Sequence, residues 1–227
     1  MSETASARNL SGLFASWRAA LLDLVFPPRC GHCGEVDLRW CSHCTTALRG
    51  AALDIETREL DGLSGLASTG IHQGILRDAV HALKYEDTQE LAQPLGERLF
   101  ATIEALNWTF DILIPVPLHM LRLRDRGYNQ SQKMGAVLAA LAQVPLNEEA
   151  LQRQRHTRPQ VGLNQQERRS NVEGAFIADA NILHNRKILL LDDVQTSGAT
   201  FQSCANAILT ANASTVYGLS VTRAVLK

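Results

Sequence analysis

The sequence of 227 residues has no long apolar run, little glycine and proline, and almost no net charge. Its longest apolar-leaning stretch, residues 10–28, contains Arg18 and Asp23, whereas a membrane span needs roughly 20 mostly apolar residues. No small-residue cleavage site follows this stretch, as one would follow a signal peptide. With 15 Gly and 7 Pro the chain is not collagen-like or Pro-rich, and 45% hydrophobic residues argue against disorder. We therefore expect a globular, cytoplasmic protein with no membrane span.

The charge is small in total but unevenly distributed along the chain. Residues 1–118 carry 9 Lys and Arg against 15 Asp and Glu, whereas residues 119–169 carry 9 against 4. A basic middle in an otherwise acidic or neutral chain indicates a local anionic ligand more than a wholly basic nucleic-acid binder.

Five cysteines, an odd number, argue against a disulfide framework in a reducing compartment. Four of them form two C-x2-C pairs with seven residues between the pairs, and these are Cys30, Cys33, Cys41 and Cys44. Each pair can place two thiolates on one metal, so the two pairs supply the four sulfurs of a tetrahedral, structural zinc site. The alternative is a redox C-x-x-C motif, which usually occurs singly. Cys204 lies in an apolar helical stretch and is expected to be a small core residue.

The composition divides the chain into four segments. Residues 1–28 predict an N-terminal amphipathic helix, because the apolar residues follow helical spacing until two prolines end it. The alternative is a membrane-surface or partner helix, but its polar face has few Lys and Arg. Residues 29–50 predict a zinc ribbon, 51–65 a polar linker, and 66–227 the main domain.

The main domain alternates between strand and helix patterns. Short apolar strands are expected at 111–117, 188–191 and 215–221. Helices are expected at 75–85, 90–106, 129–142 and 199–211. Short apolar strands separated by helices are typical of parallel βαβ units, so the sequence predicts an α/β fold with a mostly parallel sheet.

The most informative segment, residues 188–200, reads ILLLDDVQTSGAT. Asp192 and Asp193 follow an apolar strand, at the carboxyl end where open α/β sheets bind ligands. The turn after them opens a helix, and its N–H groups and hydroxyls can hold a phosphate. A ligand with both sugar hydroxyls and a phosphate would satisfy the carboxylates and the turn together. The alternatives are a plain helix N-cap and a metal site on the aspartate pair.

Two further segments carry the positive charge. Arg122, Arg124 and Arg126 alternate, so they would share one side of an extended chain, and arginine suits phosphate oxygens. Residues 153–171 are long, polar and basic, and predict a loop over the site. The alternative for both segments is a solvated basic surface.

Residues 188–200 resemble the phosphoribosyl-pyrophosphate (PRPP) signature of the type I phosphoribosyltransferases. In that family the acidic pair contacts the ribose hydroxyls, and by this match the role falls on Asp192 and Asp193. The loop that holds the 5′-phosphate corresponds to Thr196, Ser197, Gly198, Ala199 and Thr200.

Nearly the whole chain resembles the ComF/GntX family, bacterial proteins linked to competence and DNA uptake. The resemblance covers the four-cysteine segment, ILRDAVHALKY at 75–85, P-V-P…R-x-R-x-R-G-Y-N-Q from 115, T-R-P-Q-x-x-L-x-x-x-E-R-x-x-N at 157–171, the Gly-Ala-Phe at 174–176, and LLLDDVQTSGAT. It departs from the family pattern at Ser197, where threonine is commoner, and at Tyr128, where phenylalanine is common.

The resemblance implies a type I phosphoribosyltransferase-like domain preceded by a small four-cysteine zinc ribbon. It implies PRPP with Mg²⁺ as ligand, Arg122 and Arg126 at the pyrophosphate, and Asp192 and Asp193 at the ribose. One hypothesis is a PRPP-dependent glycosyltransferase whose acceptor the sequence does not indicate. The other is a non-enzymatic module of the DNA-uptake machinery that binds single-stranded DNA or a motor protein and uses PRPP as an effector or not at all.

Overall fold

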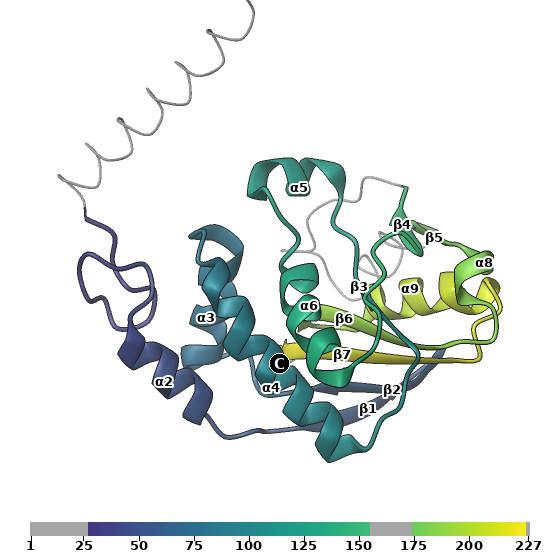
Figure 1. The fold of residues 1–227 in the computed structure, drawn as a ribbon, viewed down its shortest axis with the longest axis horizontal. Helices are drawn as coiled ribbons and strands as arrows, with labels where there is room; N and C mark the ends of the chain where they lie inside the picture. The colour runs from purple at the N-terminus through teal and green to yellow at the C-terminus, as the bar shows by residue number, and fades with distance from the viewer. Residues whose placement is uncertain (1–26, 155–173, 226–227) are drawn as a thin grey trace, which may run out of the picture.

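The computed structural model describes residues 27–154 and 174–225 (Figure 1). Residues 1–26 of the helix expected over 1–28, and residues 155–171 of the loop expected over 153–171, lie outside the described residues.

A five-stranded sheet forms the centre of the main domain, in the order β1-β2-β7-β6-β3. β1 pairs antiparallel with β2, and the other three pairings are parallel. The strands are β1 (Glu56–Leu60), β2 (Leu63–Ser68), β3 (Ile112–Pro115), β6 (Lys187–Gln195) and β7 (Thr215–Arg223). A short second sheet pairs β4 (Leu151–Arg153) with β5 (Phe176–Ala178). The expected α/β class with a mostly parallel sheet is therefore confirmed.

The two faces of the sheet are covered by different helices (Figure 1). Leu189 and Leu191 of β6 belong to the core beneath α3 (Gly74–Tyr85), α4 (Ala92–Leu106) and α6 (Gln130–Ala142). The alternate residues of β6, Ile188 and Leu190, belong to the core on the opposite face. That second core holds α9 (Ala199–Thr210), with the short α8 (Ala180–Leu183) packed against α9. Both faces of β6 are thus apolar, which explains its unbroken run of four aliphatic residues.

The four-cysteine segment packs against this domain. Cys30, Cys41 and Cys44 are buried in the same core as Leu83 of α3. The second cysteine pair lies where α2 (Ser42–Gly50) begins, and Cys41 is the N-cap residue of that helix. The expected small four-cysteine unit ahead of the main domain is confirmed, and its second half is helical.

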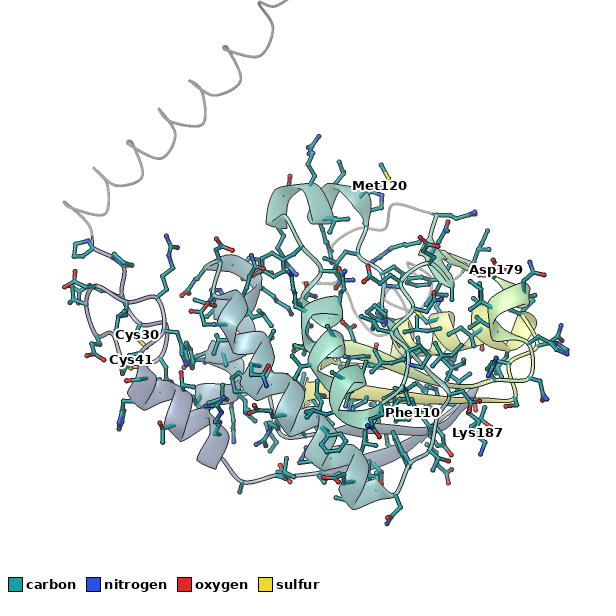
Figure 2. The ribbon with its side chains drawn as sticks, viewed as in Figure 1. Cys30, Cys41, Phe110, Met120, Asp179 and Lys187 are labelled. Atoms are coloured by element: carbon teal, nitrogen blue, oxygen red, sulfur yellow. The ribbon has the colours of Figure 1, made fainter. Side chains whose placement is uncertain are left out.

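Two local expectations differ from the structure. Residues 51–65, expected to be a linker, contain β1 and the start of β2. β1 reads ETREL and lies at the sheet edge with four of its five residues polar, so its composition resembles a loop. Residues 120–126, expected to be extended, form the short helix α5 (Met120–Arg126), which projects from the domain (Figure 2). A 3₁₀ turn, η1 (Gln89–Leu91), joins α3 to α4.

Within residues 27–154 and 174–225, no helix has the length and apolar character that crossing a membrane requires.

Close packing of α4 against α6 gives a test of this fold. A Cβ on Gly96 would lie 2.5 Å from the Cβ of Val137 and 3.0 Å from the carbonyl oxygen of Met134. We expect Gly96→Ala to lower the free energy of unfolding by about 1–3 kcal/mol through overpacking, measured by urea denaturation. The control, Gly50→Ala at the end of α2, has nothing within 4 Å and should cost no stability.

The double variant Gly96→Ala/Val137→Gly removes the Cβ and Cγ1 atoms of Val137, which the new methyl would meet at 2.5 and 2.7 Å, so it should lose less stability than the two single variants do in sum. A Gly96→Ala protein as stable as the Gly50→Ala control would contradict the packing described here.

Candidate functional site

A cavity of about 720 Å³ opens at the carboxyl ends of β3 and β6. Residues from α3, from the segment after β3, from β4 and from β6 line it together. The residues expected from the sequence that line it are Arg122, Arg126, Asp192, Asp193, Thr196 and Thr200. Three other expected residues, Ser197, Gly198 and Ala199, are not part of its wall. The fold thus brings the acidic pair, two of the loop hydroxyls and two arginines to one cavity.

Asp193 is held on both carboxylate oxygens. Lys84, in the last turn of α3, places its Nζ atom 2.7 Å from Oδ1 of Asp193. The amide of Gln130 donates to Oδ2, and the side-chain oxygen of Gln130 accepts a hydrogen bond from Arg126. Arg126, Gln130, Asp193 and Lys84 therefore form a chain of contacts from α5 to α3.

Asp192 is less completely engaged. Its Oδ1 atom accepts hydrogen bonds from the Ser131 hydroxyl at 3.2 Å and from the Asp193 N–H at 2.9 Å. Burial, with the adjacent negative charge of Asp193, raises the pKa of Asp192 to about 7. The protein therefore holds a carboxyl group in the cavity that changes charge near neutral pH.

Because α5 is a helix, its three arginines do not all lie on one face. Arg122 and Arg126 are four residues apart, so they lie on the same helix face, and both line the cavity. Arg126 also stacks over the Tyr85 ring at 5.0 Å. Arg124 is not part of the cavity wall, and its nearest acidic neighbour is Asp125, at 3.8 Å. The expectation that all three share one side was therefore wrong, because the segment is helical.

The turn after the acidic pair leads into α9 through Gly198, whose φ of +82° favours glycine. A Cβ at Gly198 would lie 2.8 Å from both the Arg58 guanidinium and the Leu60 side chain. Arg58 donates to the carbonyl oxygen of Thr196 at 3.2 Å. Arg58 and Leu60 of the polar edge strand β1 thus pack against the loop. Thr200, in the first turn of α9, lines the cavity.

Other contributors to this cavity have a weaker role, or none, when only the sequence is considered. Arg153 is the first residue of the basic segment expected as a loop over the site; it belongs instead to β4, lines the cavity and lies 5.4 Å from the Phe176 ring centroid. Lys84, in the ILRDAVHALKY segment, is only a weaker candidate from the sequence, because a lysine on a helix surface is usually solvated. Gln130 and Ser131 were missed, because only the structure shows that these polar residues at the start of α6 are buried.

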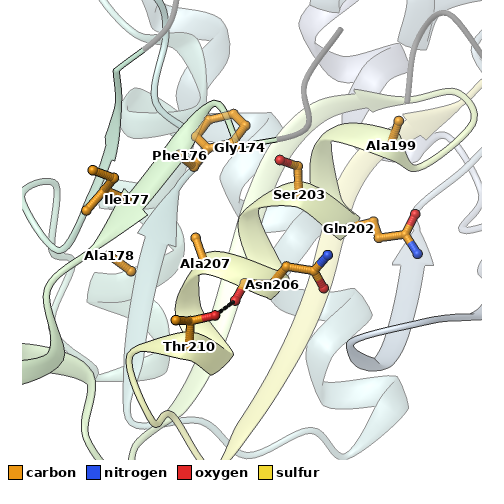
Figure 3. A pocket seen from close by; sticks show the side chains of 10 residues that line it. All are labelled: Gly174, Phe176, Ile177, Ala178, Ala199, Gln202, Ser203, Asn206, Ala207 and Thr210. Atoms are coloured by element: carbon orange, nitrogen blue, oxygen red, sulfur yellow. Dashed lines mark hydrogen bonds between the residues drawn. The ribbon is translucent and has the colours of Figure 1, made fainter. Parts of the chain in front are cut away.

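A second cavity, of about 550 Å³, lies between β5 and α9 on the far side of the loop (Figure 3). Its wall includes Ala199, one of the expected loop residues, and Phe176. The Thr210 hydroxyl, also in this wall, donates to the Asn206 carbonyl oxygen of the same helix at 2.8 Å. No charged side chain of the described residues lines this cavity, so the chemistry expected of an anion site belongs to the first one.

The four cysteine sulfurs lie within 4.8 Å of one another, close enough to hold one metal ion (Figure 2). Zinc–sulfur bonds of 2.3 Å in a tetrahedron place the sulfurs about 3.8 Å apart, and the Cys33 and Cys41 sulfurs are 3.6 Å apart. Backbone N–H groups of Cys41 and Cys44 point at the sulfurs of Cys30 and Cys41, at 3.5 and 3.4 Å. The set fits a structural metal with four sulfur ligands.

Burial raises the pKa of Cys30, but N–H groups of Cys33 and His32 outweigh it and bring the value to about 6. Burial and the surrounding thiols raise the pKa of Cys44. The same unit is tied to α3, since His32 Nδ1 lies 2.8 Å from Oδ2 of Asp78. Arg39 donates to the carbonyl oxygen of Glu86 at 3.2 Å.

The domain has a mostly parallel sheet with an acidic pair and a glycine-containing loop at the carboxyl ends of its strands, which is where open α/β sheets bind ligands. The chain is 26% identical over 188 residues to Competence protein F of Haemophilus influenzae, covering 80% of this chain and 78% of that protein. It is 30% identical over 142 residues to DNA utilization protein YhgH of Escherichia coli O157:H7, covering 60% of this chain and 62% of that protein. These matches confirm the resemblance to the ComF family.

The chain thus spans less than two thirds of the length of that YhgH protein. No family model matches it. Solved structures that are similar to it include two enzymes. The allosteric regulatory enzyme of purine biosynthesis has a TM-score of 0.41 and 14% identity, covering 62% of this chain and 30% of that chain. Glutamine PRPP amidotransferase from B. subtilis, complexed with ADP and GMP, has a TM-score of 0.44, 13% identity and the same coverages.

The close approach of Arg58 and Leu60 to Gly198 gives a test of how the site is built. We expect Gly198→Ala to lower the free energy of unfolding more than Gly127→Ala does, measured by urea denaturation. Both glycines have a φ of +82°, but a Cβ at Gly127 meets nothing within 4 Å. The conformational cost, about 1–2 kcal/mol, is therefore common to both, and the difference reports the close approach of Arg58 and Leu60.

Adding Arg58→Ala to Gly198→Ala should reduce the difference in unfolding free energy between the Gly198 and Gly127 variants. Equal losses for the Gly198 and Gly127 variants would show that β1 does not press on the loop.

Proposed function

We propose that the cavity at the carboxyl edge binds PRPP together with Mg²⁺. The observation that carries this proposal is the meeting, in one cavity, of a carboxylate, a helix-opening loop and three arginines: Arg122, Arg126 and Arg153. A volume of about 720 Å³ lies within the range of small-molecule sites. A ligand with hydroxyls in its middle and phosphates at both ends matches this order of groups.

In this assignment the loop from Thr196 to Thr200 takes the 5′-phosphate at the positive end of α9. Asp192 accepts hydrogen bonds from the ribose hydroxyls, and Arg122 and Arg126 hold the pyrophosphate. Ser197, Gly198 and Ala199 shape the loop from outside the cavity wall. Mg²⁺, which usually takes few protein ligands, would supply positive charge that stabilises the leaving pyrophosphate.

The same groups fit a glycosyl transfer. The bond from the anomeric carbon to pyrophosphate breaks, its electron pair leaves with pyrophosphate, and an acceptor nucleophile forms the new bond. Arginines at the leaving group and a carboxylate beside the developing positive ring stabilise the separating charges. The described residues do not indicate the acceptor.

The names of the relatives support a role in DNA uptake or utilisation. A second candidate function is a non-enzymatic module that binds single-stranded DNA or a motor protein and uses PRPP as an effector or not at all. One observation favours it: α5 exposes Met120, Leu121 and Leu123 beside Arg124, with 78% of Met120 exposed (Figure 2). Mixed apolar and basic surfaces are typical of docking sites.

Titration with PRPP by calorimetry tests the first function. We expect saturable binding in Mg²⁺, and about tenfold or more weaker binding for Arg122→Ala, because a charge-assisted hydrogen bond is lost. Arg124→Ala is the matched control on the same helix, since Arg124 is exposed and lies outside the cavity wall. It should bind PRPP as the wild type does.

If the protein does not bind PRPP at millimolar concentration, the PRPP function is contradicted and the non-enzymatic module is the remaining candidate. The module predicts salt-dependent binding of single-stranded DNA, weakened by Arg124→Ala. Equal effects of the two variants on PRPP binding would contradict the placement of Arg122.

We further propose that the four-cysteine unit, within residues 29–50, holds a structural zinc ion. We expect one zinc per chain in the wild type, measured by elemental analysis, and loss of zinc in Cys30→Ala. The melting temperature of Cys30→Ala should also fall, because metal binding contributes to folding. Cys204→Ala is the control, since Cys204 is a buried cysteine of α9 far from the cluster in sequence. A Cys30→Ala protein that keeps its full zinc content would contradict this assignment.

A further inference from the structure

The ion pair between Lys84 and Asp193 is the most enclosed charge pair around the ligand cavity. Only 18% of the Lys84 side chain and 6% of the Asp193 side chain are exposed, and the charged atoms are 2.7 Å apart. Lys84 reaches this position from α3, a helix that follows β2, whereas Asp193 lies on β6. The pair therefore connects two elements that are far apart in the sequence.

The two aspartates of the acidic pair differ in how many of their carboxylate oxygens the neighbouring residues contact. Lys84 and Gln130 each occupy one oxygen of Asp193. On Asp192, Oδ1 accepts two hydrogen bonds, from Ser131 and from the Asp193 N–H. The remaining oxygen of Asp192 accepts no hydrogen bond from the described residues. That oxygen is the acceptor that the pair offers to a ligand.

We propose that Lys84 is a positioning residue for the acidic pair: its ammonium group fixes Asp193 and compensates its charge, so that Asp192 serves as the ionised carboxylate facing the ligand. The identity of the ligand rests on the proposed PRPP function. The arrangement of charges belongs to the free protein and can be tested without any ligand.

Charge balance explains why this cation is needed. Two adjacent carboxylates in a partly buried place repel each other, and without a cation one of them takes up a proton. Removing one partner of a buried pair leaves the other charge uncompensated. Lys84 lowers the pKa of Asp192, against the burial and the Asp193 charge that raise it to about 7.

The other charged and titratable groups near the pair act differently from Lys84. The pKa of His72 is lowered by its burial and then by the Lys84 charge, so this imidazole is neutral at pH 7. The arginines of the cavity wall are Arg122, Arg126 and Arg153. Arg126 reaches Asp193 through Gln130, and the charge of Arg153 attracts that of Asp192. Burial and the Asp192 charge raise the pKa of Cys204, which stays a thiol.

The sign of the pH dependence follows from the raised pKa. An ionised Asp192 accepts hydrogen bonds from ligand hydroxyls at its remaining oxygen, and a protonated one has lost part of that capacity. Ligand affinity should therefore be full above the pKa of Asp192 and decline as the pH falls through it. Removal of Lys84 moves this decline to higher pH.

The direct test is a carboxyl ¹³C NMR titration of the ligand-free protein, with the Asp192 signal assigned through Asp192→Asn. In Lys84→Met we expect the pKa of Asp192 to rise by about one pH unit or more, since a cation at this distance typically lowers a carboxyl pKa by 1–3. Lys84→Arg should keep the value near that of the wild type. Lys187→Met is the control, because Lys187 is exposed at the opposite end of β6. An unchanged Asp192 titration in Lys84→Met would overturn the proposal.

A second variant covers the case in which Lys84→Met does not fold. Lys84→Met/Asp193→Asn removes both charges of the pair, so it should fold and should return the pKa of Asp192 toward the wild-type value. If the pKa of Asp192 in the double variant is instead as high as the pKa expected in Lys84→Met, the charge of Lys84 does not determine the pKa of Asp192.

Calorimetry separates this proposal from the proposed function. If the wild type binds PRPP, Lys84→Met should bind about fivefold or more weakly at pH 7, because raising the pKa of Asp192 from about 7 by one pH unit lowers its ionised fraction from about a half to about a tenth, and it should regain affinity at higher pH. If the wild type does not bind PRPP, the PRPP function fails while the NMR result still decides the role of Lys84. A pH-independent loss of affinity in Lys84→Met would show that Lys84 contacts the ligand directly, and would contradict the positioning role.

Discussion

Burial of β6 on both of its faces is the constraint from which the site follows. Ile188 to Leu191 have no exposed surface, and their alternate side chains enter two separate cores. A strand of this kind is stable only in the interior of a sheet with helices on both sides. It pairs with β7 on one side and β3 on the other, so its polar end emerges where those strands also end. The acidic pair is thus placed at the carboxyl edge by the packing of four aliphatic residues.

The cavity at that edge brings opposite charges together at short range. The two carboxylates would repel an anionic group in the same cavity unless cations offset their charge. Lys84 meets Asp193 from α3, and Arg122 and Arg126 of α5 line the same cavity. The result is a cavity whose wall combines carboxylates, hydroxyls and guanidinium groups.

Much of this site was predictable because its signals are local in the sequence. Residues 188–200 contain the patterns of a strand, an acidic pair and a helix-opening turn in consecutive order, and the structure has all three. The cysteine spacing likewise predicted that the four sulfurs would meet. The ion pair of Lys84 was not predictable, since it joins positions 84 and 193 and a lysine at the end of a helix is usually solvated. The edge strand β1 was mistaken for a linker because an edge with polar residues on both faces has the composition of a loop. The arginines of α5 were assigned to an extended chain because their spacing of two residues fits a strand as well as it fits a seven-residue helix.

The order of the strands has a consequence for the synthesis of the chain. β7 lies between β2 and β6, and its partner in β2 comes about 150 residues earlier, with Gly65 opposite Tyr217. While the ribosome is still producing the preceding segments, the β1–β2 hairpin has one unpaired edge and β6 has another. Neither edge can close until residues 215–223 have left the exit tunnel. Contacts of such long sequence separation form slowly, so the nascent protein carries the unpaired edge of β2 through most of its translation, whereas the edge of β6 (Lys187–Gln195) waits only for the last part of the chain.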